Sequence, residues 1–183
     1  MRKLLFFILV VFLSCKSETI PKPKAFLSLQ YKEASYKSLQ LQRPYSFEVS
    51  RNAVVKDEPK NWLKIHYPML DASIDITYRQ LDKNVRELLV ESERLVFKHT
   101  VKAEQIASND YSNAAKKVFG TLHEITGNAA SQIQFHITDS TKHFIKGALY
   151  FNTKPNFDSI LPAVEYIKKD ILRLMETFEW RDL

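Results

Sequence analysis

The spacing of apolar residues changes along the chain, and this change constrains the fold more than any single motif. Apolar and polar side chains alternate through residues 45–50, 62–67 and 72–78, which is typical of half-buried β-strands. After these segments the apolar positions recur every three or four residues, as they do along an amphipathic helix. The sequence therefore predicts three strands and then one long helix over 83–107, which the polar stretch 109–113 ends.

The second half of the chain repeats this order. Strand-like segments cover 116–126, 130–138 and 143–152, with turn residues between them. A second helix begins at Asp158 or Ser159 and carries the stripe Ile160, Val164, Ile167, Ile171, Leu174 and Phe178. We expect an α+β fold: a mostly antiparallel sheet of about six strands, with two long amphipathic helices packed against it. This order of elements is similar to the fold that the photosystem subunit PsbP shares with the nuclear transport factor Mog1.

The first residues have the layout of a secretory signal. Two cations precede an apolar run over residues 4–13, which is too short to span a membrane as a helix. Cys15 is the single cysteine of the chain and follows the small residue Ser14, where bacterial lipoprotein processing acylates the new N-terminus. We therefore expect Cys15 to be lipidated. An ordinary cleaved signal with an incidental cysteine is the alternative.

These features divide the chain into three parts. We expect a lipoprotein signal peptide over 1–14, a lipidated cysteine with a proline-rich tether over 15–24, and a single globular domain over 25–183. Hydrophobic residues make up 45% of the chain, which is enough to build a packed core. Because the one cysteine is assigned to the lipid, neither a disulfide nor a thiolate metal site is expected, and packing alone must hold the domain together.

Charge and glycine content argue against several function classes. The net charge of +6 is spread over cations that are interspersed with acids, whereas nucleic-acid binding calls for a concentrated basic stripe. The three glycines form neither a phosphate-binding loop nor the strained turn that carries a hydrolase serine. We therefore expect no nucleic-acid partner and no cofactor.

The turn between the last two strand-like segments groups chemically active side chains, namely Asp139, Ser140, Thr141, Lys142 and His143. Residues crowded into one tight turn cannot easily point to a common atom, as a nucleophile and its base must. The surrounding segment, 128–159, is rich in polar and aromatic residues, which form either a buried polar network or a recognition surface. We interpret Asp139–His143 as a candidate interaction surface.

The histidines do not predict a metal site, because no pair has the spacing that places two ligands on one face of a helix. His99 differs from the others, since it falls on the apolar stripe of the first predicted helix. A buried imidazole needs a hydrogen-bond partner or loses its charge. We therefore interpret His99 as a polar residue of the structural core.

Several strings of the sequence resemble the family of the gliding-motility lipoprotein GldD of Bacteroidetes. The resemblance covers nearly the whole mature chain and includes RPYSFEV, WLKIHYPMLDASIDITY, KHTVKAEQI, TDSTKHF and METFEW. It implies a lipoprotein of the outer membrane that faces the periplasm and serves gliding motility and the linked type IX secretion system. It also implies a functional dependence on other gliding lipoproteins, GldJ in particular, and it supplies no catalytic residue.

Three functional hypotheses follow. The leading one is a non-catalytic component or assembly factor of the motility and secretion machinery, which is anchored through Cys15 and docks on other envelope components. The second is an envelope lipoprotein that binds a small molecule between its sheet and helices. The third is an envelope hydrolase that uses His99, Asp139 or His143.

Overall fold

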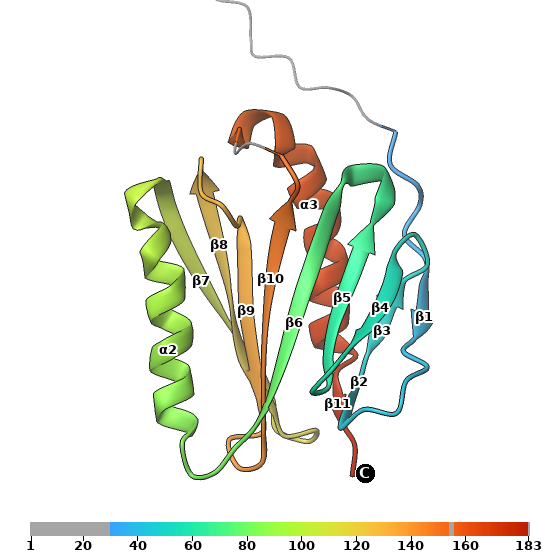
Figure 1. Ribbon diagram of the computed structural model, residues 1–183, viewed down its shortest axis with the longest axis vertical. Helices are drawn as coiled ribbons and strands as arrows, with labels where there is room; N and C mark the ends of the chain where they lie inside the picture. Colours follow the sequence, from blue (N-terminus) through green and yellow to red (C-terminus); the bar gives the residue numbers. More distant parts are fainter. Residues whose placement is uncertain (1–29, 154–155, 183) are drawn as a thin grey trace, which may run out of the picture.

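The computed structural model describes residues 30–153 and 156–182 (Figure 1). The expected signal peptide, Cys15 and the tether lie outside the described residues. Among the described residues, no helix has the length and apolar character needed to cross a membrane. The helices are α2 (Val85–Phe97), α3 (Phe157–Glu176) and the short 3-10 helices η1 (Pro68–Leu70) and η2 (Lys98–Val101). The strands are β1 (Tyr36–Ser38), β2 (Tyr45–Ser46), β3 (Glu48–Ser50), β4 (Val54–Glu58), β5 (Trp62–Tyr67), β6 (Ala72–Gln80), β7 (Ala103–Asn113), β8 (Val118–Gly127), β9 (Ile133–Thr138), β10 (His143–Phe151) and β11 (Glu179–Trp180).

One seven-stranded sheet dominates the molecule, in the order β4-β5-β6-β10-β9-β8-β7. Every neighbouring pair in it is antiparallel. The chain also forms two small sheets of two strands each. In one, β1 pairs with β3 within the N-terminal segment, and in the other, β2 pairs with the C-terminal strand β11. The chain therefore has the predicted α+β fold with a mostly antiparallel sheet.

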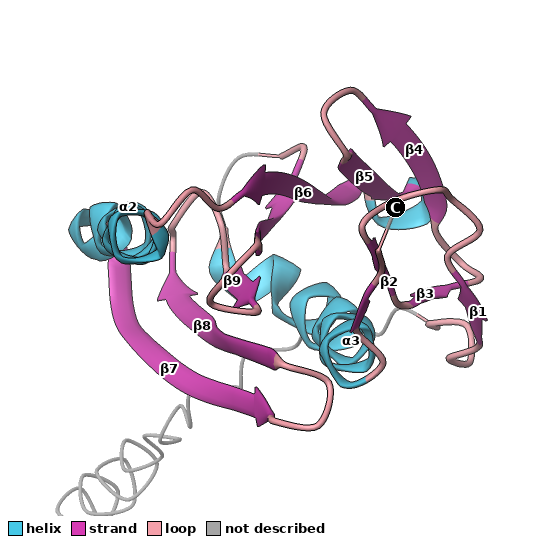
Figure 2. Ribbon diagram, turned by 90° about the horizontal axis from the view of Figure 1, so that it is seen from below, coloured by secondary structure: helices cyan, strands magenta, loops and turns pink. Residues whose placement is uncertain are grey.

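The main core lies between α3 and one face of this sheet. Ile133, Phe135 and Ile137 of β9 belong to the same buried cluster as Ile167 and Ile171 of α3. Figure 2 shows that the sheet curls around α3, with β7 and β8 on one side and β4 and β5 on the other. The apolar stripe predicted for the second helix is therefore the face that α3 buries against the sheet.

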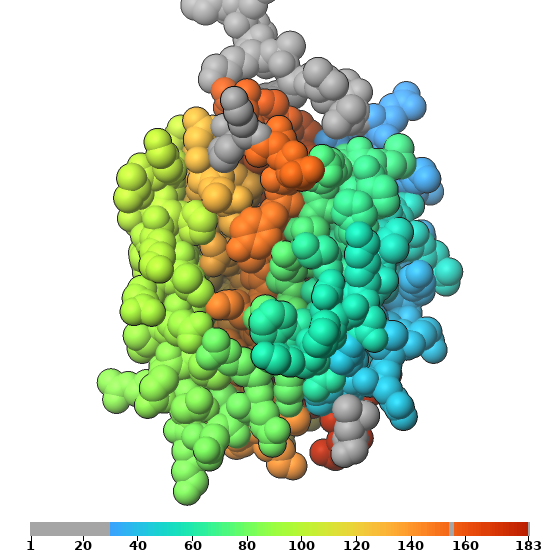
Figure 3. Space-filling view, viewed as in Figure 1, coloured from blue at the N-terminus to red at the C-terminus, as the bar shows by residue number. Residues whose placement is uncertain are grey.

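α2 lies on the opposite face and covers only part of it. Its Leu88 packs with Phe144 of β10, and its Val96 packs with Ile125 of β8. In Figure 3 the surface of β10 is visible between α2 and strands β4–β6. Both helices therefore pack on the sheet, but the β4–β6 half of this second face stays open.

The turns of the antiparallel sheet collect at two opposite ends of the molecule (Figure 1). The described chain begins at Gln30 beside η1, at what we call the entry end. This end also contains the connections 68–71, 98–102 and 128–132. The other end, which we call the distal end, contains the connections 59–61, 81–84, 114–117 and 139–142.

The expected helix over 83–107 is wrong beyond Phe97. The chain leaves α2 through η2 and continues as the 11-residue strand β7 at the edge of the sheet. Ala103 and Ile106 continue the helical spacing only by coincidence. The β-branched pair Thr100-Val101 and the run of Ser, Asn and Asp that follows are poor helix formers.

The expected strand over 45–50 is also different in the structure. It is split into β2 and β3, and neither belongs to the main sheet. β2 pairs with β11, whose partner residues Glu179 and Trp180 are more than 130 positions away in the sequence. The place of an outer strand is taken by β4, which the sequence pattern missed because its residues are mostly exposed.

Candidate docking site at the β9–β10 turn

The predicted interaction surface is a closed turn built around Asp139. The Asp139 Oδ1 accepts hydrogen bonds from the backbone N–H of Thr141, Lys142 and His143 at 2.8–2.9 Å. The Thr141 hydroxyl donates to Oδ2 at 3.1 Å. Burial raises the pKa of the Asp139 carboxyl, but these hydrogen bonds outweigh it and hold the pKa below its ordinary value. The carboxylate is therefore engaged in shaping the turn.

A second set of contacts fixes the tip of the turn. The Thr138 hydroxyl donates to the carbonyl of His143 and accepts from the backbone N–H of Ser140. Ser140 has a left-handed backbone with φ 64°. Ser140, Thr141 and Lys142 are exposed. The turn thus presents three polar side chains on a backbone that is held in place.

His143 links the turn to the aromatic residues behind it. Its Nδ1 lies 2.8 Å from the Tyr78 hydroxyl, and its ring stacks on Trp180 with 5.0 Å between centroids. Trp180 in turn donates from Nε1 to the carbonyl of Lys117 in the β7–β8 turn. Burial and the nearby Lys142 lower the pKa of His143, against the opposing influence of Asp139. A neutral imidazole is therefore the stable form at neutral pH.

The distal end joins segments that are far apart in the sequence. Tyr45 packs near Tyr78 and Phe178, with ring centroids 6.0 Å and 6.1 Å apart. Trp180 contacts Phe178 edge-on. These residues come from the strings RPYSFEV, WLKIHYPMLDASIDITY and METFEW, which meet TDSTKHF here. Sequence reasoning missed this aromatic support, although the same strings carried the family resemblance.

Each of the four distal turns presents an exposed lysine. Lys60, Lys83 and Lys117 lie in three of them, with φ between 52° and 60°. Lys142 lies in the fourth. A left-handed backbone is less costly for glycine or asparagine than for lysine. The distal turns therefore carry these four lysines and also Lys116, which pairs with Glu179 at 2.8 Å.

His99 lies far from this turn. It is half-buried in η2 at the entry end, and its Nε2 accepts a hydrogen bond from the Gln134 side-chain amide at 2.7 Å. The expectation that His99 lies on a buried helical stripe is wrong, because α2 ends before it. Gln134 and Asp139 are five residues apart, which is about 17 Å along a strand. The structure therefore brings Asp139 and His143 together but does not bring His99 to them.

Two further histidines are buried beneath α2. His123 accepts or donates a hydrogen bond at Nδ1 with the Ser108 hydroxyl, and its ring lies 6.4 Å from that of His136. The His123 Nε2 and the His136 Nδ1 are buried without a hydrogen-bond partner. Within residues 30–153 and 156–182, no three acidic, histidine or cysteine side chains are grouped as metal ligands.

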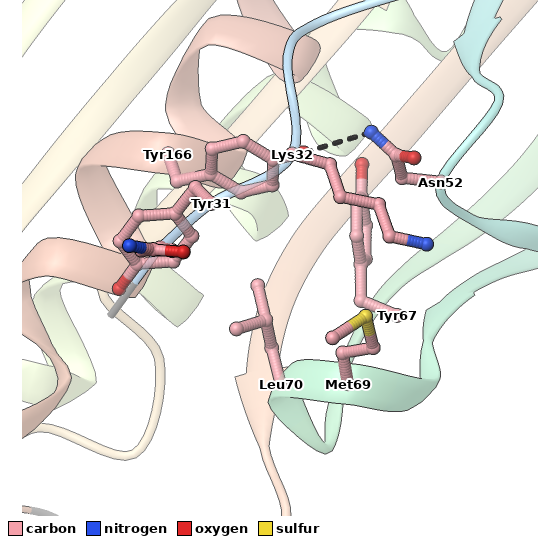
Figure 4. Close-up of a pocket in the computed structure, with 8 residues that line it drawn as sticks. Tyr31, Lys32, Asn52, Tyr67, Met69, Leu70 and Tyr166 are labelled. Carbon is pink, nitrogen blue, oxygen red and sulfur yellow. Dashed lines mark hydrogen bonds between the residues drawn. The ribbon is translucent and has the colours of Figure 1, made fainter.

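A small apolar pocket lies at the entry end (Figure 4). Tyr31 stacks on Tyr166, and Tyr166 accepts a hydrogen bond from Asn52, as Figure 4 shows. The buried Tyr31 hydroxyl has no hydrogen-bond partner. Met69 and Leu70 of η1 form the opposite wall. The pocket volume of about 90 Å³ is well below the several hundred Å³ of typical small-molecule sites.

A larger hollow lies on the open half of the sheet. It has a volume of about 390 Å³ and is lined by Lys56, Lys64, His66, Asp75 and Tyr150, among others. The Lys64 Nζ lies 3.4 Å from the Asp75 Oδ2 on the neighbouring strand. The lining is polar and solvent-exposed, so it lacks the apolar walls that enclose most small-molecule ligands.

Comparison with known proteins identifies one family. The model of the gliding motility lipoprotein GldD matches residues 16–180 of the chain. This match includes the whole described domain up to Trp180, and therefore both the turn Asp139–His143 and its aromatic support. No curated protein sequence matches the chain.

Proposed function

Because the chain belongs to the family of the gliding motility lipoprotein GldD, we propose that it is a non-catalytic docking component of the gliding and type IX secretion machinery. It is a lipid-anchored envelope protein, as its family implies. The anchor is Cys15, in the outer membrane, with the domain facing the periplasm. The distal end binds another envelope protein of the machinery, of which a GldJ-type lipoprotein is the leading candidate.

The observation that carries this proposal is the construction of the β9–β10 turn. The backbone N–H groups of Ser140, Thr141, Lys142 and His143 are satisfied within the turn, and the His143 ring stacks on Trp180. A rigid, pre-organised surface loses little entropy on binding, so its exposed side chains contribute more to affinity. The exposed lysines of the four distal turns favour a partner with an acidic surface.

The other two hypotheses have weaker support. A ligand-binding role is favoured by the unpartnered Tyr31 hydroxyl in the apolar pocket, but that pocket is small. A hydrolase would need Asp139 as a base or orienting group, and its oxygens already accept four hydrogen bonds within the turn. Docking requires no reactive group at the turn, and the Asp139 carboxylate is already engaged in holding the turn together.

The test is charge reversal at the turn. Lys142→Glu should reduce recovery of the partner by affinity purification from the native envelope and should reduce gliding, while circular dichroism and melting temperature stay unchanged. Lys169→Glu is the matched control, because Lys169 is also exposed but lies on α3. Equal partner recovery with both variants would contradict the proposal.

A second comparison separates docking from catalysis. Asp139→Asn and Ser140→Ala remove reactive groups but keep much of the contact surface. Docking predicts that gliding and secretion remain largely intact in both variants. Loss of function in either one, with the fold and partner binding preserved, would favour the hydrolase.

A further inference from the structure

The entry end exposes large apolar side chains that the docking site does not explain. Val101 of η2 and Met69 of η1 are the most exposed large apolar residues of the described chain, at 85% and 76%. Phe97, at the end of α2, is 55% exposed. Single exposed apolar residues are common, but here they gather at one end of the molecule.

These side chains lie at both sides of the entry end. Met69 follows β5, and Val101 precedes β7 at the edge of the sheet. Between β6 and β7 there are four strand-to-strand steps, or about 19 Å. The entry end therefore presents two separated apolar points, one at η1 and one at the α2–η2 junction. In contrast, the distal turns present exposed lysines, and the exposed large apolar residue beside them, Trp62, is only 39% exposed.

The described chain also begins at this end. Gln30 lies beside Met69 and Leu70, and Cys15 is 15 residues earlier in the sequence. Fifteen residues span at most about 50 Å when fully extended. A lipid on Cys15 therefore keeps the entry end within reach of the bilayer that holds the anchor.

We propose that the entry end rests on the lipid bilayer, with Met69, Phe97 and Val101 inserted among the headgroups. Lys98 and Lys102 flank Val101 and can extend their charged ends to the phosphates. Glu33 and Glu104 lie at the same end and balance part of this charge, so the contact depends on the apolar residues and does not require anionic lipid. The entry end therefore contacts the surface of the same membrane that holds the lipid anchor. This inference rests on lipid anchoring and is independent of the docking partner.

The experiment measures membrane depth at chosen positions. The lipidated full chain is reconstituted into vesicles of phosphatidylethanolamine and phosphatidylcholine. An environment-sensitive fluorophore is attached at Val101→Cys, Met69→Cys, Val90→Cys or Lys142→Cys. Val90 is 56% exposed on α2, eleven residues or about 16 Å of helix before Val101, and Lys142 lies at the distal end. All four positions are exposed, so each variant should fold normally.

The proposal requires a graded result. The probes at Val101 and Met69 should show a several-fold rise in emission and a shift to shorter wavelength on reconstitution. The probe at Val90 should respond weakly, and the probe at Lys142 should not respond.

Equal responses at Val90 and Val101 would mean that α2 lies flat on the bilayer, and this would overturn the proposal. The proposal would also fail if the probes at Val101 and Met69 did not respond, or if the protein did not float with the vesicles. None of these outcomes depends on partner recovery with Lys142→Glu, so failure here is distinct from failure of the docking proposal.

Discussion

At the scale of single residues, Gly147 shows how closely the sheet packs. A Cβ atom at this position would lie 2.2 Å from the Phe135 ring, which covers Gly147 from the neighbouring strand. Glycine is therefore required here by space, although it weakens a strand by itself.

Gly147→Ala should destabilise the domain by about 1 to 3 kcal/mol, because the Phe135 ring must move within a closed core. Urea denaturation measures this change. Phe135→Leu in the same chain should recover part of the loss, because it removes the atoms that the new methyl group meets. A double variant no more stable than Gly147→Ala would contradict this explanation.

Asp139 acts in the turn as a capping residue acts at a helix start. Asp139→Ala leaves three backbone N–H groups without their acceptor and should cost about 1 to 2 kcal/mol, by analogy with helix caps. Asp139→Asn keeps an acceptor oxygen and should cost less. Thermal unfolding of the two variants checks this order, and an equal loss in both would show that the charge, not the oxygen, holds the turn.

At the scale of elements, α2 covers a layer of buried histidines. Burial, and to a lesser extent the nearby His123, lower the pKa of His136 to about 4 against the opposing influence of Asp110. Burial also lowers the pKa of His123, and Glu93 of α2 opposes that shift. Protonation is therefore easier in the unfolded chain than beneath α2.

This layer predicts a loss of stability in mild acid. Unfolded histidines titrate near pH 6.5. Between about pH 6.5 and about pH 4 the unfolded state binds more protons than the folded state, so the free energy of unfolding falls as pH falls through this window. Each histidine contributes at most about 1.4 kcal/mol per pH unit. Urea unfolding across this range tests the slope, and His136→Asn should flatten it. An unchanged slope in that variant would show that groups other than His136 cause the effect.

The sequence predicted elements well where burial follows a simple period. The segments 62–67, 72–78 and 143–152 match β5, β6 and β10 within two residues, because each has one face in the core. The first half of β7, residues 103–107, was predicted as helix and 109–113 as the stretch that ends it, because an exposed edge strand has no strict alternation. The turn Asp139–His143 was found from its residue types. Its support by Tyr78 and Trp180 was not, since those contacts join residues that lie far apart in the chain.

At the scale of the whole molecule, the last described residues close the distal end. Trp180 holds the β9–β10 turn through His143 and the β7–β8 turn through Lys117. Trp180→Ala should loosen both turns while leaving the core around α3 folded. Hydrogen exchange should become faster at 139–143 and 114–117, and partner recovery should fall. Tyr150→Ala, at an exposed aromatic residue on the open face, is the control and should leave exchange in both turns unchanged.

The strands of the main sheet run between the entry end and the distal end (Figure 1). The hydrogen bonds of an antiparallel ladder lie perpendicular to its strands. Tension between a bilayer at one end and a partner at the other is therefore directed along the strands and strains many ladder bonds at once in shear. A sideways pull at β7 would instead break them one after another from the edge. The orientation of the sheet thus gives the domain its greatest mechanical resistance along the line that joins the proposed membrane contact to the proposed docking surface.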